Sequence, residues 1–562
     1  MATGDQGAVG ERSSPTGREL LGRPELNRDA AFTAAEREQL RLRGLLPWRV
    51  VPIQEQVELE LEHLRRKGDD LERYIGLAAL QERNQTLFYR VLIDHLEELA
   101  PIVYTPTVGQ ACREFSHVVR RPHGLWVTPD DLGHIPDLLR NAAEGDVKLL
   151  VVTDNERILG LGDQGAGGMG IPVGKLALYT AGAGIHPSHT LPVSLDCGTD
   201  NQELLADPQY LGYPRPRLRG PEYDAFIEAF VEAVLEVFPR ALLQWEDFKQ
   251  HNAIRLLDRY RRRIASFNDD VQGTAAVVLG GILAELRHRG ERLSDQRLVF
   301  LGAGAAGTGI ARMAEAFMAR EGTEPPELRR RVMVLDSRGL VFEGREALKD
   351  DTLPFMVPAA VLAELGMPAG PRHDLDEVVA RVSPTILVGV SGVAGSFTER
   401  AVRAMAQGCP APIIMPLSNP TLNSEATPEE IMRWTDGRAV VATGSPFAPV
   451  RVGDRARVVG QANNVFVFPG IGLGAIIARA REVTDGMLLT AAEALSQLVT
   501  SDRLKAGAMY PNLQELRSIS REIALAVARE ARSEGVGQLR TDDALESAAD
   551  QEMWDPSYLP LA

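Results

Sequence analysis

The sequence predicts an α/β protein in which an all-helical N-terminal domain precedes two parallel-sheet domains. From residue 53 to residue 99, apolar residues recur every three or four positions, as in packed amphipathic helices. Between residues 148 and 264, short apolar runs alternate with helical segments, the βαβα order of a parallel sheet. From residue 298, a second alternation begins with an apolar strand and Gly302-x-Gly304-x-x-Gly307. This pattern indicates that the second sheet belongs to a Rossmann-type dinucleotide-binding domain.

Changes in pattern along the chain place the domain boundaries. We predict a disordered leader over residues 1–30, a helical domain over 31–125, an α/β domain made of 126–268 and 458–535, a Rossmann domain over 269–457, and a C-terminal tail over 536–562.

Individual residues predict where several helices begin and end. Thr33 and Glu36 form a capping-box pattern that opens a helix, which Gly44 can close. Pro101 is expected to stop the last helix of the N-terminal domain. Thr128 and Pro129 are expected to open another helix as N-cap and first residue.

Composition limits the possible partners. The net charge of -16 repels phosphate backbones and anionic membranes, so neither nucleic acid nor a membrane is expected as a partner. Three cysteines, far apart in the sequence, argue for a reducing compartment. The chain has no apolar run of about 18 residues that could span a membrane. We therefore expect a cytoplasmic location.

Two acidic pairs, Glu246/Asp247 and Asp269/Asp270, each follow a short apolar run. If the two runs are neighbouring parallel strands, the pairs meet at the edge of the sheet where α/β proteins bind ligands. Carboxylates about 4 Å apart repel by about 4 kcal/mol at an effective dielectric constant of about 20. A hard divalent cation, Mg²⁺ or Mn²⁺, would remove that cost. The alternative is that both pairs are solvated loop acids.

A glycine-rich loop contains the candidate base. Seven glycines lie between Gly160 and Gly174, and Lys175 is expected to open the helix that follows. A cation at a helix N-terminus opposes the macrodipole, which would lower the lysine's proton affinity and suit a general base. The alternative is an exposed, solvated ammonium. Tyr104, next to a Thr-Pro pair, is by itself more typical of a packing residue.

The glycine motif predicts how a dinucleotide would bind. The first glycine makes the turn, the second admits the pyrophosphate, and the third lets helix and strand pack closely. Asp336 ends the next strand, where an acid can accept hydrogen bonds from a ribose 2′-hydroxyl. This favours NAD, while nearby Arg338 keeps NADP possible. Asn419 ends a strand at the edge where a nicotinamide would lie, or else makes an Asx-turn. Asn464 belongs to an asparagine pair that could instead cap a helix.

Long ordered blocks of sequence carry a family resemblance. From about residue 41 to residue 535 the chain resembles the malic enzymes, through the blocks YTPTVG, VVTDNERILGLGDQG, GMGIPVGKL, LPVSLDCGTDN, LLQWEDF, FNDDVQGTAAV, FLGAGAAGTGIA, PLSNPT and GQANNVFVFPG. The resemblance assigns roles to individual residues. Glu246, Asp247 and Asp270 would be metal ligands, Tyr104 and Lys175 would transfer protons with Asp269 beside the lysine, and Arg157, Asn419 and Asn464 would bind the malate carboxylates. The dinucleotide would be bound by Gly302, Gly304, Ala305, Ala306, Gly307 and Asp336, together with Arg157 and Asn419.

The resemblance also implies an activity. It predicts oxidative decarboxylation of (S)-malate to pyruvate and CO₂ with NAD, or NADP, and Mn²⁺ or Mg²⁺, together with decarboxylation of oxaloacetate. It further implies a homodimer or homotetramer. Two alternatives remain: a malolactic enzyme that converts malate to lactate with bound NAD, and a non-catalytic dinucleotide-binding regulator.

Overall fold

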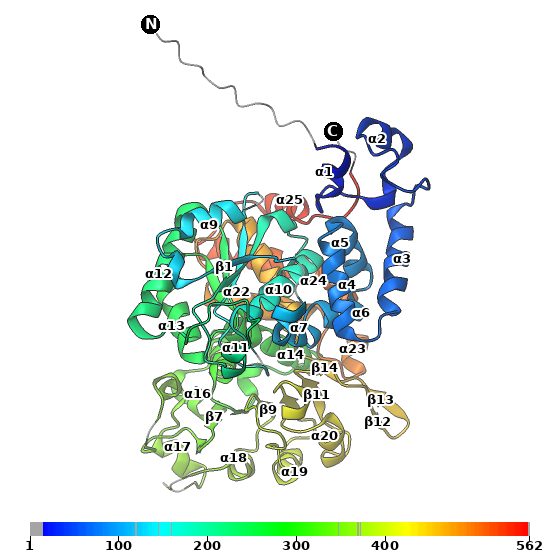
Figure 1. The fold of residues 1–562 in the computed structure, drawn as a ribbon. Coiled ribbons are helices and arrows are strands. Elements are labelled where there is room, and N and C mark those ends of the chain that lie inside the picture. The colour runs from blue at the N-terminus through cyan, green and yellow to red at the C-terminus, as the bar shows by residue number, and fades with distance from the viewer. Residues whose placement is uncertain are drawn as a thin grey trace. The chain divides into compact units, whose positions relative to one another are not determined.

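The computed structural model describes residues 15–118, 121–143, 145–158, 160–346, 348–367, 370 and 372–559. The chain forms two compact units (Figure 1). The helical unit comprises residues 1–111, 118–121 and 555–562, and the α/β unit comprises residues 112–117 and 122–554. No helix in the described ranges is long and apolar enough to cross a membrane.

All regular secondary structure in the described part of the helical unit is helical. Its helices are α1 (Gly17–Leu21), α2 (Ala34–Gln39), α3 (Ile53–Arg65), α4 (Asp70–Gln81), α5 (Gln85–Asp94), α6 (Leu96–Val103) and the start of α7 (Thr107–Arg113). Residues 1–14 of the predicted disordered leader lie outside the described residues. From residue 15 to residue 30 the predicted leader is folded, so the prediction of disorder is wrong there. Helix α1 forms because Leu20 is buried against a small apolar cluster that includes Phe32 and Leu42.

Local signals in this unit succeeded only in part. The capping box between Thr33 and Glu36 is confirmed at the start of α2. Gly44 does not close this helix, since α2 ends at Gln39 and Leu40 is its C-cap. The prediction for Pro101 is also wrong, because the helix breaks earlier, at the non-helical His95, and Pro101 lies inside the new helix α6. Burial of α6 leucine, isoleucine and valine side chains offsets the backbone hydrogen bond that proline cannot make.

The first sheet of the α/β unit is parallel throughout. Its order is β1-β3-β2-β4-β5, made of β1 (Leu125–Val127), β2 (Leu149–Thr153), β3 (Thr190–Leu195), β4 (Leu242–Trp245) and β5 (Ser266–Asn268). Helices α9 (Ile135–Ala142), α12 (Gly220–Val237) and α13 (Gln250–Tyr260) share one apolar core with this sheet. Helix α10 (Gly170–Ala183) contacts strands β2 and β3. Thr128 and Pro129 open a short 3₁₀ turn, with Thr128 as the predicted cap.

The second sheet has the Rossmann arrangement that the glycine motif predicted. Its order is β14-β11-β10-β9-β6-β7-β8, made of β6 (Leu298–Leu301), β7 (Val332–Asp336), β8 (Gly339–Leu340), β9 (Ile386–Gly389), β10 (Ile413–Pro416), β11 (Val440–Thr443) and β14 (Gly460–Gln461). All pairs are parallel except β7 with β8. The chain runs from β6 toward one edge and then, from β9, toward the other. The switch point between β6 and β9 is where such sheets bind ligands.

Helices from the C-terminal part of the chain complete the α/β unit. Helices α14 (Thr274–Arg289), α21 (Phe468–Ala478), α22 (Asp485–Leu498) and α24 (Leu516–Ser533) pack on one another, and α10 packs against α21 and α24. The predicted C-terminal tail contains helix α25 (Asp542–Glu552), which contacts α21 and α24 and buries Leu545 and Ala549. The precise domain boundaries stay a prediction.

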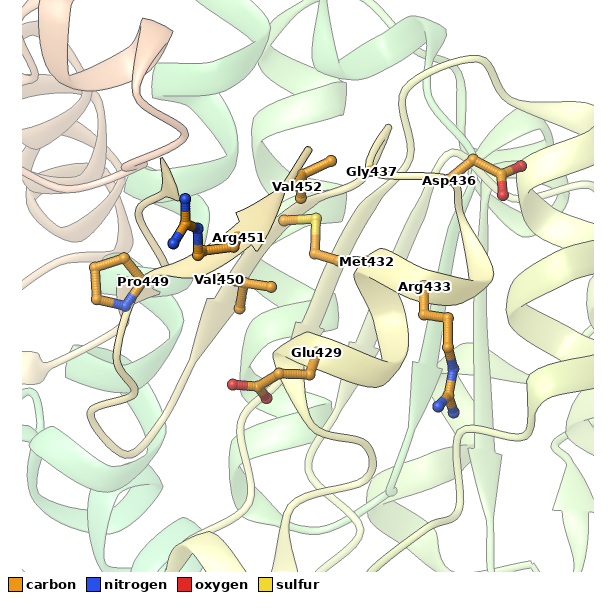
Figure 2. Close-up of a pocket in the computed structure, with 9 residues that line it drawn as sticks. All are labelled: Glu429, Met432, Arg433, Asp436, Gly437, Pro449, Val450, Arg451 and Val452. Carbon is orange, nitrogen blue, oxygen red and sulfur yellow. The ribbon is translucent and has the colours of Figure 1, made fainter. Parts of the chain in front are cut away.

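A hollow of about 500 Å³ lies between helix α20 (Pro428–Trp434) and the hairpin of β12 (Val450–Val452) and β13 (Arg455–Arg457) (Figure 2). Apolar Met432 and Val450 line it together with charged Glu429 and Arg451. None of its lining residues was predicted as a site residue.

Candidate active site

The two acidic pairs meet, as the sequence predicted. Strands β4 and β5 are parallel neighbours, and Trp245 is paired in register with Asn268. Glu246 immediately follows β4, and Asp269 immediately follows β5. Both acidic pairs therefore lie at the carboxyl edge of the sheet. Glu246 is 2% exposed and Asp269 is 0% exposed. The alternative of solvated loop acids is therefore wrong for these two side chains.

The backbone of Asp247 ties the two pairs together. Asp247 adopts a left-handed conformation, with φ of 57°, directly after Glu246. In this conformation its N–H donates to Asp270 Oδ2 at 2.7 Å, and its carbonyl accepts from the N–H of Arg157 at 3.1 Å. Non-glycine residues in this region store strain and gather at functional sites. The turn thus joins both acidic pairs to the loop that carries Arg157.

Lys175 lies between two of the carboxylates. Its Nζ is 2.8 Å from Glu246 Oε1 and 2.6 Å from Asp269 Oδ2, and the side chain is 2% exposed. The predicted position at a helix N-terminus is wrong, because α10 already begins at Gly170 and Lys175 lies in its second turn. The macrodipole argument therefore does not apply. Direct pairing with two buried carboxylates dominates the surroundings of this lysine.

Asp269 is the centre of a small polar network. Its Oδ2 also accepts from Asn464 Nδ2 at 2.9 Å, and Asn464 donates to Thr274 Oγ1 at 3.0 Å. The neighbouring Asn463, not Asn464, caps the short helix η9 (Asn464–Phe466) by accepting from the N–H of Val465. Asp269 Oδ1 is buried and finds no hydrogen-bond partner within the described part of the chain. Asp269 therefore keeps an unused acceptor at the centre of the site.

The site carries excess negative charge. Burial, and next the charges of Asp270 and Asp269, raise the pKa of Glu246 well above that of an ordinary glutamate, although Lys175 opposes the shift. The crowding of protein atoms around Asp270, and next the charge of Asp269, likewise raise its pKa. A further positive charge would stabilise this arrangement.

The donor chemistry fits a hard divalent cation. Glu246, Asp247 and Asp270 offer only carboxylate oxygens, which Mg²⁺ and Mn²⁺ prefer, and Asp269 Oδ1 is a buried acceptor beside them. Among the described residues, no three His, Cys, Asp or Glu side chains are already arranged around one cation position. Instead, Lys175 pairs with Glu246 Oε1, Gln244 donates to Glu246 Oε2, and the backbone N–H of Asp247 donates to Asp270 Oδ2.

The glycine motif has the close approaches that the sequence predicted. Gly302 follows β6 with φ of 119°, and a Cβ on it would lie 2.5 Å from the carbonyl oxygen of Val390, after β9. Gly304 is the N-cap of α15 (Ala305–Arg320), so the helix begins with Ala305 and Ala306. A Cβ on Gly307 would lie only 1.9 Å from the carbonyl oxygen of Gly302. The loop is thus built tightly at the switch point.

The acidic turn packs directly against the helix that follows this loop. The π-helical turn η5 (Asp269–Gly273) contacts α15. A Cβ on Gly309 of α15 would lie 2.7 Å from the carbonyl oxygen of Val271 in this turn. The turn that follows the first sheet's carboxyl edge therefore packs on the helix that follows the glycine loop.

Comparison with known proteins identifies the family. The sequence matches the family descriptions "Malic enzyme, N-terminal domain" over residues 81–261 and "Malic enzyme, NAD binding domain" over residues 271–532. It is 48% identical over 545 residues to the NAD-dependent malic enzyme of Pseudomonas aeruginosa PAO1, covering 96% of each chain. The chain belongs to the malic enzyme family. It is also 48% identical over 539 residues to the NAD-dependent malic enzyme of Sodalis glossinidius, covering 96% of this chain and 95% of that one.

Solved malic enzyme structures share this architecture. The crystal structure of the Entamoeba histolytica malic enzyme matches with a TM-score of 0.54 and 25% identity, covering 81% of this chain and 80% of that chain. The malic enzyme from Pyrococcus horikoshii matches with a TM-score of 0.54 and 23% identity, covering 81% and 89%, which supports the fold alone. The predicted fold class is confirmed.

The remaining predicted residues lie in different surroundings. In this malic enzyme the side chain of Arg157 is exposed, beside the acidic turn. Asn419 follows β10, and its Oδ1 accepts from Ser445 Oγ rather than forming an Asx-turn. Tyr104 ends helix α6 in the helical unit. The roles predicted for these residues stay predictions.

Asp336 has a charged partner in the loop that follows it. Arg345 binds both carboxylate oxygens of Asp336, with Nη1 at 2.9 Å from Oδ1 and Nη2 close to Oδ2. The backbone N–H of Arg338 also donates to Asp336 Oδ1 at 2.8 Å. Side-chain hydrogen bonding to Arg345 helps to lower the pKa of Asp336 against the effect of burial. A cation therefore accompanies the acid that was predicted to bind ribose.

Gln244 was missed by sequence reasoning. Its Nε2 donates to Glu246 Oε2 at 2.8 Å, and its side chain is fully buried. The available signal was a polar residue inside the otherwise apolar strand LLQW. An amide buried in a sheet must have hydrogen-bond partners, since leaving it unpaired costs about 1–3 kcal/mol.

Proposed function

We propose that the chain catalyses the divalent-metal-dependent oxidative decarboxylation of (S)-malate to pyruvate and CO₂, with NAD as the hydride acceptor. The observation that carries this proposal is the buried lysine between two carboxylates, in a cluster that is rich in carboxylates and packs against the helix of the glycine loop. Family membership and the nearly full-length similarity to NAD-dependent malic enzymes support it.

Lys175 is the proposed base for the malate hydroxyl. The proton that leaves the hydroxyl passes to Lys175 Nζ, and Asp269 Oδ2, 2.6 Å away, stabilises the ammonium that results. Burial of both side chains strengthens this interaction relative to water. When bound, NAD would supply the acceptor for the hydride that leaves C2.

Loss of CO₂ follows from the β-keto acid, so the same site can decarboxylate oxaloacetate. The electron pair left behind moves onto the C2 oxygen. Mn²⁺ or Mg²⁺ held by Glu246, Asp247 and Asp270 would supply a Lewis acid there. Tyr104 then protonates C3 as the proposed general acid, which yields pyruvate.

Three polar side chains are proposed to hold the malate carboxylates. Arg157 offers a guanidinium fork that matches a carboxylate in geometry and charge. Asn464 and Asn419 add amide donors. The position of Asn464 beside Asp269 supports its assignment. A substrate carboxylate bound by Asn464 would lie next to Asp269 and Lys175, the proposed base.

NAD is the proposed dinucleotide, with NADP as the alternative. Gly302, Gly304, Ala305, Ala306 and Gly307 would receive the pyrophosphate at the N-terminus of α15, where the helix dipole favours negative charge. Asp336 would accept hydrogen bonds from the ribose hydroxyls and repel a 2′-phosphate. Arg345 partly offsets that repulsion, so the preference is a matter of degree.

The decisive experiment measures NADH formation with millimolar malate and Mn²⁺. We expect NADH to appear with pyruvate in equal amounts, at a higher initial rate with NAD than with NADP. Lactate without net NADH would identify a malolactic enzyme instead. No product with either dinucleotide would exclude the proposed activity and favour a non-catalytic regulator.

Gly304→Ala tests the dinucleotide loop separately from the chemistry. Among the residues that the structure describes, a Cβ at this position meets only Gln250 Oε1, at 3.8 Å, so the fold should tolerate it. The methyl group would nevertheless occupy the path of the pyrophosphate, and we expect the Kd for NAD to rise at least about tenfold, or ~1.4 kcal/mol. Calorimetric titration with NAD measures the Kd, and thermal unfolding measures stability.

Gly133→Ala is the matched control, because a Cβ there meets no atom within 4 Å among the described residues. Its NAD affinity should equal that of the parent protein. If Gly304→Ala binds NAD as tightly as the parent, the pyrophosphate does not pass this glycine.

Two further proposals concern location and assembly. The structure describes all three cysteines, Cys112, Cys197 and Cys409, and each is buried and free, which supports a reducing compartment such as the cytoplasm. Family membership supports a homodimer or homotetramer, which light scattering of the purified protein would distinguish.

A further inference from the structure

A fully buried amide lies directly behind the acidic cluster. In β4, Leu243 and Trp245 belong to the apolar core shared with α12 and α13, so the intervening Gln244 points to the opposite face of the sheet. Glu246, two residues on, shares that face. Gln244 and Glu246 are hydrogen-bonded there at 2.8 Å.

Gln244 is held in one orientation by a second partner. Gln244 presents its Nε2 group to Oε2 of Glu246, so its amide has one defined orientation at this site. Its Oε1 then faces away, and the hydroxyl of Tyr179 donates to it. Tyr179, Gln244 and Glu246 therefore form a continuous chain of hydrogen bonds that ends at Lys175.

Tyr179 is itself seated by a neighbouring helix. It lies one turn after Lys175 on α10, and the Phe468 ring of α21 is 4.9 Å from its ring and 4.5 Å from Lys175 Nζ. One turn after Phe468, a Cβ on Gly472 would lie 2.6 Å from Tyr179 Cε1. The glycine thus leaves the space that the tyrosine ring needs, beside the helix that carries the proposed base.

We propose that Gln244 and Tyr179 are positioning residues that set the orientation of the Glu246 carboxylate and thereby the metal affinity of the site. The inference rests on the proposed function, since it assigns Glu246 to a metal. Without Gln244, the Oε2 atom of Glu246 loses the hydrogen bond that this amide donates, and the carboxylate can rotate away from its present orientation. Tyr179 acts only through Gln244, because its hydroxyl prevents the amide from turning its carbonyl oxygen toward Glu246.

The test measures Mn²⁺ binding without malate or NAD, by electron paramagnetic resonance of free Mn²⁺. Gln244→Met keeps the side-chain length and removes both hydrogen bonds, and we expect its Kd for Mn²⁺ to rise about 10- to 100-fold, as when partners of metal ligands are removed. Tyr179→Phe removes one hydroxyl and should raise the Kd about 2- to 10-fold. The double variant should be no weaker than Gln244→Met, because Tyr179 has nothing left to orient.

Tyr510→Phe is the matched control. Tyr510 is also a buried tyrosine, and it donates a single hydrogen bond, to the carbonyl oxygen of Val277. Removing this hydroxyl in Tyr510→Phe should leave the Kd for Mn²⁺ unchanged. NAD affinity should be unchanged in every variant, because none of these side chains lines the glycine loop.

Two results would overturn the inference. The first is an unchanged Mn²⁺ Kd in Tyr179→Phe and Gln244→Met, which would make the pair a structural contact only. The second is additive losses in the double variant, which would mean that Tyr179 does not act through Gln244. Failure of the proposed function is a different outcome, in which the parent protein itself forms no NADH from malate. If Gln244→Met does not fold, Tyr179→Phe, which removes one atom, still decides the question.

Discussion

Replacing Asp270 with asparagine is expected to lower kcat/KM for malate by about 10³-fold or more. A metal Lewis acid contributes several kcal/mol of transition-state stabilisation, and each ~1.4 kcal/mol corresponds to a factor of about ten. Asparagine removes one negative charge from the proposed metal ligands but retains an oxygen that can accept from the N–H of Asp247. Activity should therefore fall while the fold persists.

Two measurements check this expectation. Initial rates over a Mn²⁺ series should show a loss that higher metal concentrations restore only in part, and thermal unfolding of the metal-free protein should change little. Glu285→Gln is the control, since Glu285 is a buried carboxylate on α14 that pairs with Arg289 outside the site. An Asp270→Asn protein with parental activity would show that the metal assignment is wrong.

Lys175→Ala should abolish malate oxidation and leave NAD binding measurable. A positioned general base contributes about 10²- to 10⁴-fold. Removing the ammonium also leaves Glu246 and Asp269 without their shared cation, and breaking a buried pair in this way destabilises proteins by about 3–5 kcal/mol. Loss of activity in this variant alone therefore does not separate chemistry from folding.

Lys175→Arg makes that separation. The guanidinium keeps the positive charge beside both carboxylates but cannot give up its proton, so the variant should be more stable than Lys175→Ala and equally inactive. Calorimetric titration measures NAD binding by both variants, thermal unfolding measures their stability, and initial rates with malate measure their activity.

The control is Lys148→Ala. Lys148 pairs with Glu552 just before β2, at the opposite end of the strand from the site. This variant should keep its activity. If Lys175→Ala and Lys175→Arg both lose NAD binding as well, the lysine serves the structure rather than the reaction.

Patterns that depend on neighbouring residues predicted the fold well. Alternating apolar runs and helical segments specify parallel strands, and parallel strands bring their carboxyl ends to one edge. Glu246 and Asp269 were therefore expected to meet if their strands were neighbours, as β4 and β5 are. The close approaches at Gly302 and Gly307 followed in the same way, because the turn between β6 and α15 is a local structure.

Helix ends and side-chain partners were harder to predict. Pro101 lies inside a helix because α6 buries enough apolar surface to tolerate it, and Lys175 lies in the second turn because the glycine-rich segment before it is already helical. Both outcomes depend on packing against segments that are distant in sequence, and rules for helix ends consider only neighbouring residues.

The sequence by itself determined two sheets of mostly parallel strands, a glycine loop at the start of one helix, and acidic pairs at the ends of two strands, because periodicity and turn signals are local properties. Only the tertiary structure decided which charges meet. Lys175 pairs with Glu246 and Asp269, Arg345 holds Asp336, and Gln244 joins Tyr179 to Glu246. Apart from Arg345 with Asp336 and Gln244 with Glu246, these partners lie far apart in the chain, and burial selects such pairs because unpaired polar groups are costly away from water.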